Sequence, residues 1–443
     1  MNLERRLRSL DELSAPDLYG EIERRVGAPA GVSASDDSLG WEGGKRLRVA
    51  LLALVLFLAA VSFLWAAFIP DGGEQPADTR TADPWAWAPE GWSELPPVPA
   101  HRDASAWVWT GRQLLVWGGY DEKNEVDVAE GYAFDPETKA WASLPPAPVV
   151  RTDASAVWTG REAIFWGGWD RDGNRMDGVA FNPQTESWRT IASAPIPARH
   201  AAVVIWTGTE MIVWGGGGRD DPSTNRSGAA YDPVTDSWHT IADAPLGLNL
   251  ASGTWTGREV IVFGSLLNDR NWAATDTSVG AAYDPRADSW RRMPASDLSP
   301  QATSAVWVGD RMVAWDFEVR AQEYFPEADR WSEPVRMPLD FSECYPDSRT
   351  VGRQVFAWFC GRAAEYDVAT GEWQEIQGGV TEPTIEAHGR PYKLYRFASL
   401  VAAGDVVVVA ATGITVDEDG VPCYGCPGAP ESMWIYRPPA VAS

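Results

Sequence analysis

Hydrophobic residues follow two different patterns along this chain. At 49–69 they form one long run, VALLALVLFLAAVSFLWAAFI, which contains a single serine and no charged residue. About 20 helical residues suffice to cross the hydrocarbon core of a bilayer, so we expect a transmembrane helix at 47–69. After residue 84 the apolar runs are short, as in AAVVIW and TEMIVW, and glycines or Asp-Pro pairs separate them. Short apolar runs between turn residues predict β-strands.

The long apolar run has basic residues on its N-terminal flank. Lys45, Arg46 and Arg48 precede it or stand at its start, whereas Asp71 and Glu74 follow it. Positive charges favour the cytoplasmic side of a membrane, and a cleaved signal peptide would have a much shorter leading segment. We therefore expect a single-pass protein of the cell membrane, with a cytoplasmic segment at 1–46, a linker at 70–83 and an extracytoplasmic β domain at 84–438.

The β domain repeats an aromatic residue that is followed seven positions later by tryptophan. This pair occurs six times, and its tryptophans are spaced 41 to 52 residues apart. Most pairs enclose a turn with proline, which fixes φ, after an Asp or Asn that can bond the backbone. A period of about 40–50 residues with several short strands is typical of propeller blades. The pairs are Phe134/Trp141, Phe181/Trp188, Tyr231/Trp238, Tyr283/Trp290, Tyr324/Trp331 and Tyr366/Trp373.

Each unit also contains a turn glycine between two apolar runs, which predicts a β-hairpin. In the first units the second run ends in two glycines, as at Gly118-Gly119 and Gly167-Gly168. A diglycine after a hydrophobic strand, followed by spaced Tyr and Trp, resembles the Kelch repeat, and the resemblance extends over 84–438. It implies an all-β fold, a seven-bladed Kelch-type β-propeller with four antiparallel strands per blade. The turn glycines are Gly111, Gly160, Gly208, Gly257, Gly309, Gly352 and Gly404.

The two ends of the repeat region complement each other. The strand around Trp92 has no aromatic strand before it, and the last unit, with Trp434 and Tyr436, has no tryptophan strand after it. We predict that the segment near 85–95 supplies the outermost strand of the last blade and closes the ring, which hides an exposed sheet edge. In that blade we expect the other strands at 397–403, 405–411 and 433–437, after a connecting loop at 378–396.

Charge and composition narrow the function. With 37 basic and 62 acidic residues the chain has a formal net charge of −25, which disfavours nucleic acid as a partner because its phosphates are repelled. The four histidines are scattered over different units, and the common hydrolase, zinc-protease and phosphate-loop motifs do not occur. We therefore expect no cofactor and predict no catalytic residue.

Three arginines stand at the same place in consecutive units, nine residues before the turn glycine, and acidic residues or a histidine accompany them. Converging guanidinium groups bind carboxylates and other anions well, which makes this set a candidate ligand-binding site. Alternatively, each arginine bonds a loop of a neighbouring blade for structural reasons. The residues are Arg102, Asp103, Arg151, Asp153, Arg199 and His200.

The loop DRDGNRMD at 170–177 has oxygen-bearing side chains at alternate positions, as calcium-binding loops do. Its candidate calcium ligands are Asp170, Asp172, Asn174 and Asp177. The glycine comes one position earlier than in an EF-hand, and no bidentate Glu follows at the right distance. An ordinary Asp-Gly turn is therefore the alternative.

All four cysteines lie in the part expected outside the membrane, where disulfides persist. Cys344 precedes the turn glycine Gly352 by eight residues and Cys360 follows it by eight, so a hairpin centred there brings them together across two strands. Cys423 and Cys426 are close enough in sequence for a bridge within a tight turn. We predict disulfides 344–360 and 423–426.

These features favour a membrane-anchored extracytoplasmic binding or scaffold protein. Its partner, a protein or a glycan, is expected on the face of the ring formed by the loops after each second strand and by the connections between blades. Two alternatives stay open. One is an extracytoplasmic carbohydrate-active Kelch enzyme, and the other is a transmembrane sensor that signals through residues 1–46.

Overall fold

The computed structural model describes residues 83–439, with interruptions at 101, 122–123, 200, 217–224, 267–276, 301–303, 317, 338–346, 360, 379–383, 388–389 and 417–428. The expected cytoplasmic segment, the transmembrane helix and nearly all of the linker therefore lie outside the described residues. Within the described ranges, no helix has the length and hydrophobicity that a membrane crossing requires.

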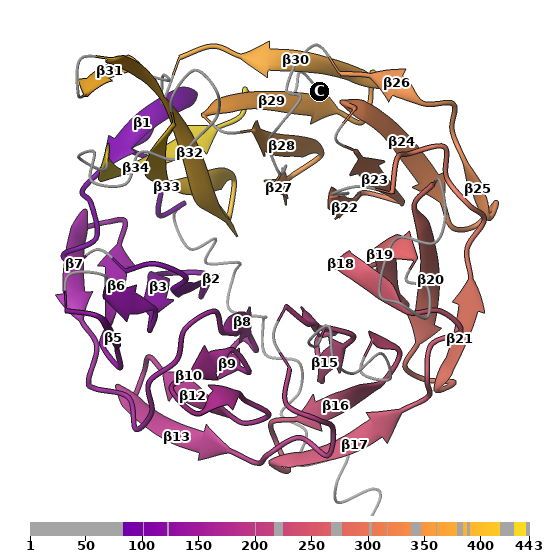
Figure 1. The fold of residues 1–443 in the computed structure, drawn as a ribbon, viewed down its shortest axis with the longest axis horizontal. Coiled ribbons are helices and arrows are strands. Elements are labelled where there is room, and N and C mark those ends of the chain that lie inside the picture. The colour runs from indigo at the N-terminus through magenta and orange to yellow at the C-terminus, as the bar shows by residue number, and fades with distance from the viewer. Residues whose placement is uncertain are drawn as a thin grey trace, which may run out of the picture. The chain divides into compact units, whose positions relative to one another are not determined.

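Seven antiparallel sheets stand around a common centre and form the blades of a propeller (Figure 1). From the inner to the outer strand, blade 1 consists of β2 (Ala106–Trp109), β3 (Leu114–Trp117), β6 (Gly131–Asp135) and β7 (Ala140–Ser143). Blade 2 consists of β8 (Ser155–Trp158), β9 (Ala163–Trp166), β12 (Gly178–Asn182) and β13 (Ser187–Ile191). Blade 3 consists of β14 (Val203–Trp206), β15 (Met211–Trp214), β16 (Gly228–Asp232) and β17 (Ser237–Ile241).

The remaining blades follow the same order, with an interruption in blade 5. Blade 4 consists of β18 (Leu248–Trp255), β19 (Val260–Leu266), β20 (Val279–Asp284) and β21 (Ser289–Arg292). Blade 5 has β22 (Ser304–Val308), β23 (Arg311–Trp315) and β24 (Arg320–Phe325), and its outer edge is divided between β25 (Arg330–Trp331) and β26 (Val335–Arg336). Blade 6 consists of β27 (Asp347–Val351), β28 (Gln354–Phe359), β29 (Arg362–Asp367) and β30 (Glu372–Ile376).

Blade 7 joins the two ends of the described chain. It consists of β32 (Arg390–Ala403), β33 (Val406–Val416), β34 (Ala429–Arg437) and, as its outer strand, β1 (Gly91–Leu95). In the register of β1 and β34, Trp92 lies opposite Tyr436 and Leu95 opposite Met433. The predicted closure of the ring by the segment around Trp92 is thus confirmed.

The hairpin of blade 7 is longer than the sequence pattern indicates. β32 begins at Arg390 rather than at 397, and β33 continues to Val416. A further strand, β31 (Thr384–Ala387), pairs with the beginning of β32. The prediction of a connecting loop at 378–396 is therefore wrong over much of its length. This segment contains aromatic residues with high strand propensity, such as Tyr392 and Tyr395, which favour the extended conformation over a loop.

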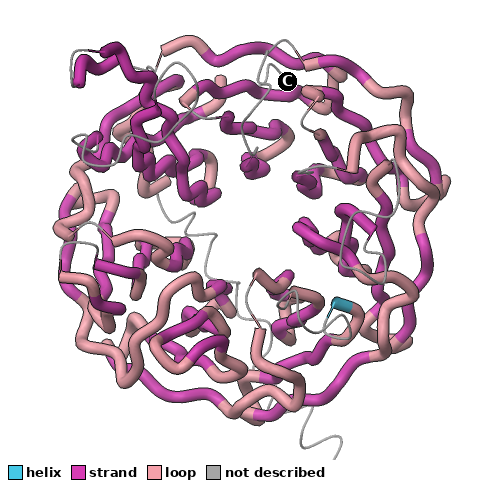
Figure 2. The backbone as a smooth tube through the Cα atoms, in the orientation of Figure 1, coloured by secondary structure: helices cyan, strands magenta, loops and turns pink. Residues whose placement is uncertain are grey.

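The hydrophobic core is divided among the junctions between adjacent blades. Each of seven buried clusters combines residues of two neighbouring blades, and each innermost strand contacts that of the next blade all around the ring. Strands and loops make up almost the whole described backbone (Figure 2). Because a sheet buries its faces only against its neighbours, the stability of each blade depends on the two blades beside it.

Outer-strand tryptophans link five of the blades to the blade before. In five blades the indole N–H donates a hydrogen bond to a backbone carbonyl that directly follows, or nearly follows, the outer strand of the preceding blade. The donor and acceptor pairs are Trp141 and Pro96 (3.0 Å), Trp188 and Pro145 (2.7 Å), Trp238 and Ala192 (2.7 Å), Trp290 and Ala242 (2.7 Å), and Trp331 and Pro294 (2.9 Å).

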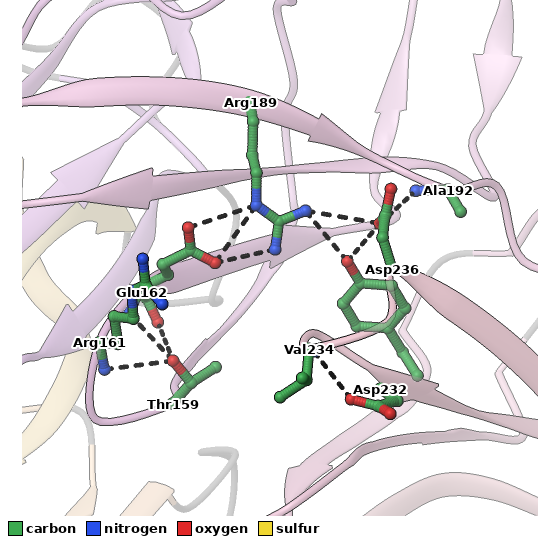
Figure 3. Close-up of polar contacts among 9 residues, drawn as sticks. Thr159, Arg161, Glu162, Arg189, Ala192, Asp232, Val234 and Asp236 are labelled. Carbon is green, nitrogen blue, oxygen red and sulfur yellow. Dashed lines mark hydrogen bonds and ion pairs between the residues drawn. The ribbon is translucent and has the colours of Figure 1, made fainter.

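A second link, which we call the arginine clasp, connects blades 2 and 3 (Figure 3). Arg189 follows the outer-strand tryptophan of blade 2 and donates to Glu162 of the same blade at 2.8 Å. Its guanidinium also donates to the hydroxyl of Tyr231 in blade 3, at 3.1 Å, and to Asp236 at 3.4 Å. The Tyr231 hydroxyl in turn donates to Asp236. One guanidinium therefore holds an outer strand of one blade against the third strand of the next.

The electrostatics of the clasp agree with this geometry. Hydrogen bonding to Glu162 raises the pKa of Arg189 further above its usual range. Burial raises the pKa of Tyr231. Burial also tends to raise the pKa of Asp236, but the hydrogen bond from Tyr231 and the nearby Arg189 lower it overall. At neutral pH the clasp is thus a protonated arginine and an ionised carboxylate around a neutral phenol.

The clasp recurs between blades 4 and 5, where Arg291 bonds Glu259 at 2.8 Å and the Tyr324 hydroxyl at 2.9 Å. Between blades 3 and 4 a histidine takes the place of the arginine, and its Nδ1 lies 3.8 Å from Glu210. Tyr283 still donates to Asp288 there, at 2.9 Å. The same positions of the repeat thus build the link with different residues.

Candidate binding surface on the loop side of blades 1 to 3

The paired glycines bring the connections between blades close to the loops that follow each second strand. Gly118 and Gly119 both have positive φ, and the Gly119 N–H donates to the Arg151 carbonyl at 2.7 Å. A Cβ at Gly118 would lie 2.5 Å from that carbonyl oxygen, so a larger residue cannot fit there without a shift. In blade 2 a Cβ at Gly168 would lie 2.4 Å from the Thr152 carbonyl. The diglycines therefore position the residues around Arg151 against the loops.

Short hairpins extend from these loops in two blades. In blade 1, β4 (Tyr120–Asp121) pairs with β5 (Val126–Asp127), and in blade 2, β10 (Trp169–Asp170) pairs with β11 (Gly173–Asn174). Isolated bridges join Asp103 to Tyr120 and Thr152 to Trp169. The connection before each blade is therefore fastened to the hairpin of that same blade.

The three arginines bond acceptors in their own repeats. Arg102 donates to Asp121 at 3.2 Å, and Arg151 donates to Asp170 at 3.0 Å and to Asp177 at 2.5 Å. Arg199 is fully buried, and its guanidinium bonds the carbonyls of its own loop together with the Ser227 hydroxyl. Its acceptors are the carbonyl oxygens of Pro197, Gly215 and Ser227, and Ser227 Oγ. These contacts order the loops of blades 1 to 3.

The residues predicted beside the arginines have backbone roles. The Asp103 N–H and carbonyl exchange hydrogen bonds with Tyr120, at 3.0 and 2.8 Å. Asp153 has a φ of 58°, and its N–H donates to the Ala104 carbonyl at 2.8 Å, which links the connections of two successive blades. His200 lies outside the described residues.

Guanidinium groups bond the acidic loop proposed for calcium. Arg175 donates to Asp170 at 2.7 and 2.5 Å and to Asp172 at 2.8 Å, while Arg151 bonds Asp177. Burial opposes ionisation of Asp170, but the hydrogen bond from Arg175 lowers its pKa overall. Asn174 pairs with Trp169 in the β10–β11 hairpin.

The carboxylates that calcium would need are thus engaged by arginine. Across the described ranges, no cluster of three or more His, Cys, Asp or Glu is arranged to hold a metal ion. Arg175 was not among the residues predicted from the sequence, although a basic residue inside an acidic loop could have indicated its role.

An open depression of about 510 Å³ lies at this network. The connection between blades 1 and 2, from Ala147 to Val150, forms part of its lining together with Ala129, and charged residues form the rest. Two large apolar side chains next to lining residues in the sequence are exposed to solvent: Trp169, before Asp170, is 42% exposed, and Met176, between Arg175 and Asp177, is 43% exposed. The polar lining consists of Arg151, Asp170, Arg175 and Asp177. The depression is therefore a fixed polar surface beside exposed apolar groups.

The cysteines predicted to form disulfides cannot be placed. Cys344, Cys360, Cys423 and Cys426 all lie outside the described residues. The hairpin of β27 and β28 ends at Asp347 and Phe359, three residues after Cys344 and one before Cys360. Both bridges stay predictions.

Comparison with known protein families agrees with the repeat pattern. Residues 81–265 match the family model of the KLHDC2/KLHL20/DRC7 Kelch-repeats domain, a range that covers the closing strand β1, blades 1 to 3 and the inner strands of blade 4. No curated protein matches the chain. The matched range contains the intact diglycines, whereas blades 5 to 7 depart from the motif. The described domain is a seven-bladed β-propeller, and its part at 81–265 matches a Kelch-repeat domain.

Proposed function

We propose that this protein is a membrane-anchored binding protein that presents its propeller outside the cell membrane. The proposal for the anchor rests on the uncharged run at 49–69 and on the basic residues before it. The propeller suits binding because its ring of sheets is a rigid support for loops. The partner binds the loop side of blades 1 and 2.

The observation that carries this proposal is the depression beside Trp169 and Met176. Aromatic residues, methionine and arginine are enriched in the cores of protein interfaces. Two arginines line this depression, and the exposed Trp169 and Met176 are neighbours in sequence of its lining residues. Bonds to Asp170, Asp172 and Asp177 orient the two arginines in advance, so little side-chain entropy remains to be lost on binding. We therefore favour a protein as the partner over a glycan.

The test is chemical cross-linking of the full-length protein in membranes of the cells that produce it. A Trp169→Ala/Met176→Ala double variant should lose at least about tenfold of the cross-linked partner, because it removes the apolar anchors. Val234→Ala is the matched control, since Val234 is 90% exposed in the turn between β16 and β17, away from the depression. Equal capture by both variants, or binding to glycans alone, would contradict the proposal.

The anchor is tested separately. A reporter enzyme that is active only outside the membrane, fused to the C-terminus of the full chain, should give signal. Replacing Lys45, Arg46 and Arg48 by glutamate should reduce that signal, because the charge difference orients the helix. Activity from a cytoplasm-dependent reporter at the same position would show the opposite topology.

A further inference from the structure

The junction between blades 5 and 6 lacks the tryptophan link found elsewhere. Trp373 is the outer-strand tryptophan of blade 6, at the position of the five tryptophans that donate to the preceding blade. Its indole nitrogen is buried and has no hydrogen-bond partner among the described residues, as is also true of Trp92 in blade 7. An unsatisfied buried donor costs free energy, so Trp373 is suited to receive an acceptor.

The outer edge of blade 5 explains why the acceptor is missing. Its outer strand is divided into β25 and β26, and Pro334 lies between them. The Glu323 N–H donates to the side chain of Ser332 at 3.0 Å, where an uninterrupted ladder would use a backbone carbonyl. Val335 is 50% exposed. The backbone that would face Trp373 has therefore diverged from the repeat.

The arginine clasp is also incomplete at this junction. The residue after the outer-strand tryptophan is arginine in blades 2 and 4 but Ser332 in blade 5. The residue five positions after the tyrosine is Asp236 or Asp329 in the two clasps but Gly371 in blade 6. Tyr366 keeps its position and pairs opposite Trp373. Serine and glycine thus stand at the positions of the arginine and the aspartate, and Arg311 stands at the position of the clasp glutamate, two residues after the turn glycine.

A cavity occupies the place of the missing side chains. Its volume is about 280 Å³, enough for one large side chain with part of its backbone. Tyr366 and Trp373 give it an aromatic wall, and Ser332 and Gly371 leave it open. Its lining includes Glu323, Ser332, Val335, Tyr366, Gly371 and Trp373.

The charges around the cavity favour a cation. Glu323 accepts the Tyr366 hydroxyl at 2.6 Å and Arg311 at 3.2 Å, and Glu333 lines the cavity from an exposed position. Arg311 is shared with Asp310, at 2.9 Å. The lining itself therefore contains two carboxylates, Glu323 and Glu333, and no basic side chain, in a chain whose net charge is −25.

We propose that this cavity binds an arginine side chain of a partner protein. The guanidinium takes the place that Arg189 and Arg291 occupy at the complete clasps, beside the Tyr366 hydroxyl and Glu323. Arginine also stacks well on aromatic rings such as that of Trp373. A backbone carbonyl of the same partner segment accepts the hydrogen bond of the Trp373 indole, as a carbonyl of the preceding blade does at five other junctions. The proposal concerns a different site from the loop-side depression and does not depend on it.

The first experiment measures binding of Nα-acetyl-L-arginine N-methylamide to the full-length chain in detergent micelles. Tryptophan is labelled with ¹⁵N, and the Trp373→Phe variant identifies the indole signal of Trp373. We expect that signal to shift on titration and the corresponding citrulline amide to bind at least about tenfold more weakly, because citrulline has the shape of arginine without its charge. Equal binding of the two amides, or an unmoved Trp373 signal, overturns the proposal.

A second variant fills the cavity from within. Ser332→Arg together with Gly371→Asp introduces the arginine and the aspartate of the clasp, while Arg311 remains at the position of its glutamate. Gly371 has a φ of 73°, and aspartate adopts positive φ at the same turn position in three other blades, at 50°, 44° and 47°. A Cβ at Gly371 would meet only the Tyr366 hydroxyl, at 3.8 Å.

We expect this variant to fold, with a melting temperature at or above that of the unmodified protein, and to bind the arginine amide at least about tenfold more weakly. Undiminished binding by the folded variant overturns the proposal. Glu323→Gln gives an independent measurement if the double variant does not fold. It should weaken binding of the arginine amide more than binding of the citrulline amide, and an equal effect on the two counts against a guanidinium at this site.

Discussion

The junction between blades 4 and 5 and the junction between blades 5 and 6 use the same repeat positions with different contents. At the first, Arg291 joins Glu259, Tyr324 and Asp329, and the Trp331 indole reaches the Pro294 carbonyl. At the second, Tyr366 and Trp373 remain, but Ser332 and Gly371 replace the arginine and the aspartate, and the Trp373 indole has no acceptor among the described residues.

The difference shows that adjacent blades stay together without the arginine clasp and without the tryptophan link. Both junctions bury a cluster of apolar residues, and the ring continues through both. The polar links can therefore vary from junction to junction, and a junction that lacks them can present its unused groups to another molecule.

The largest effect is expected from opening a junction completely. Deletion of residues 84–96 removes β1 and Trp85, a fully buried residue of the cluster between blades 7 and 1. Blade 7 then has an exposed edge, and we expect loss of the cooperative thermal transition in calorimetry. Deletion of residues 440–443, which follow the last strand of the ring in sequence, is the control and should leave the transition in place. An unchanged melting curve after the first deletion would falsify the role assigned to β1.

High pH should weaken complete and incomplete junctions together. Burial raises the pKa of Tyr324 to about 12, against the opposing effect of Arg291, and burial also raises the pKa of Tyr366. A pKa that is higher in the folded than in the unfolded state means that the folded protein holds the phenol proton more tightly. The contribution of Tyr324 is therefore complete below pH 10 and is lost as the pH rises to about 12.

Circular dichroism during alkaline titration measures this loss. Tyr324→Phe should reduce the fall in stability between about pH 10 and 12 while costing some stability at pH 7 through its lost hydrogen bonds. A variant with the same alkaline profile as the unmodified protein would exclude Tyr324 as a contributor.

Removing the clasp arginine separates the contribution of the polar link to stability from that of the hydrophobic core. Arg291→Ala should destabilise the protein by about 2 kcal/mol, because Glu259 and the Tyr324 hydroxyl lose a charged partner that is only partly exposed. Arg286→Ala removes the same charge from an exposed turn of the same blade and should change the free energy of unfolding by less than about 0.5 kcal/mol. Urea denaturation measures both. Similar values for the two variants would show that the clasp adds nothing to the core.

The smallest difference is expected between two tryptophans. Trp290→Phe loses the hydrogen bond to the Ala242 carbonyl, whereas Trp373→Phe removes a donor without a partner. Both lose a similar ring volume, so the cost of Trp290→Phe should exceed that of Trp373→Phe by about 1 kcal/mol. If the order is reversed, Trp373 has a partner in solution that the structure does not contain.

Much of the fold could be predicted because its signals are local and repeated. The interval between tryptophans and the turn glycines predicted seven blades, and the unmatched strand around Trp92 predicted the closure. The extension of the β32–β33 hairpin was missed because no repeat position marks it. Its residues form strands through pairing with β31, which pattern alone does not reveal.

The candidate sites were harder to predict than the fold. The spacing located Arg102, Arg151 and Arg199, but it could not tell that their partners would be Asp121, Asp170 and the carbonyls of a loop, since loop conformation has no periodic signal. The clasp did have a signal, with Glu two residues after the turn glycine and Arg directly after the tryptophan. The cavity at Ser332 can be recognised in the sequence only when that pattern is known, because it lies where the residues of the pattern are replaced.

The pairing of β1 with β34 has a consequence for synthesis of the protein on the ribosome. Arg437 and Asp83, which bond each other at 2.8 Å, are 354 residues apart in the chain. The strand that closes the ring is therefore made before any blade, yet its partner emerges after all of them. Blades can form during translation as they appear, but β1 has to stay unpaired until the end. A nascent chain that stops before β34 is an open ring with two unpaired edges, and such a product is open to aggregation and to proteases in a way that the finished ring is not.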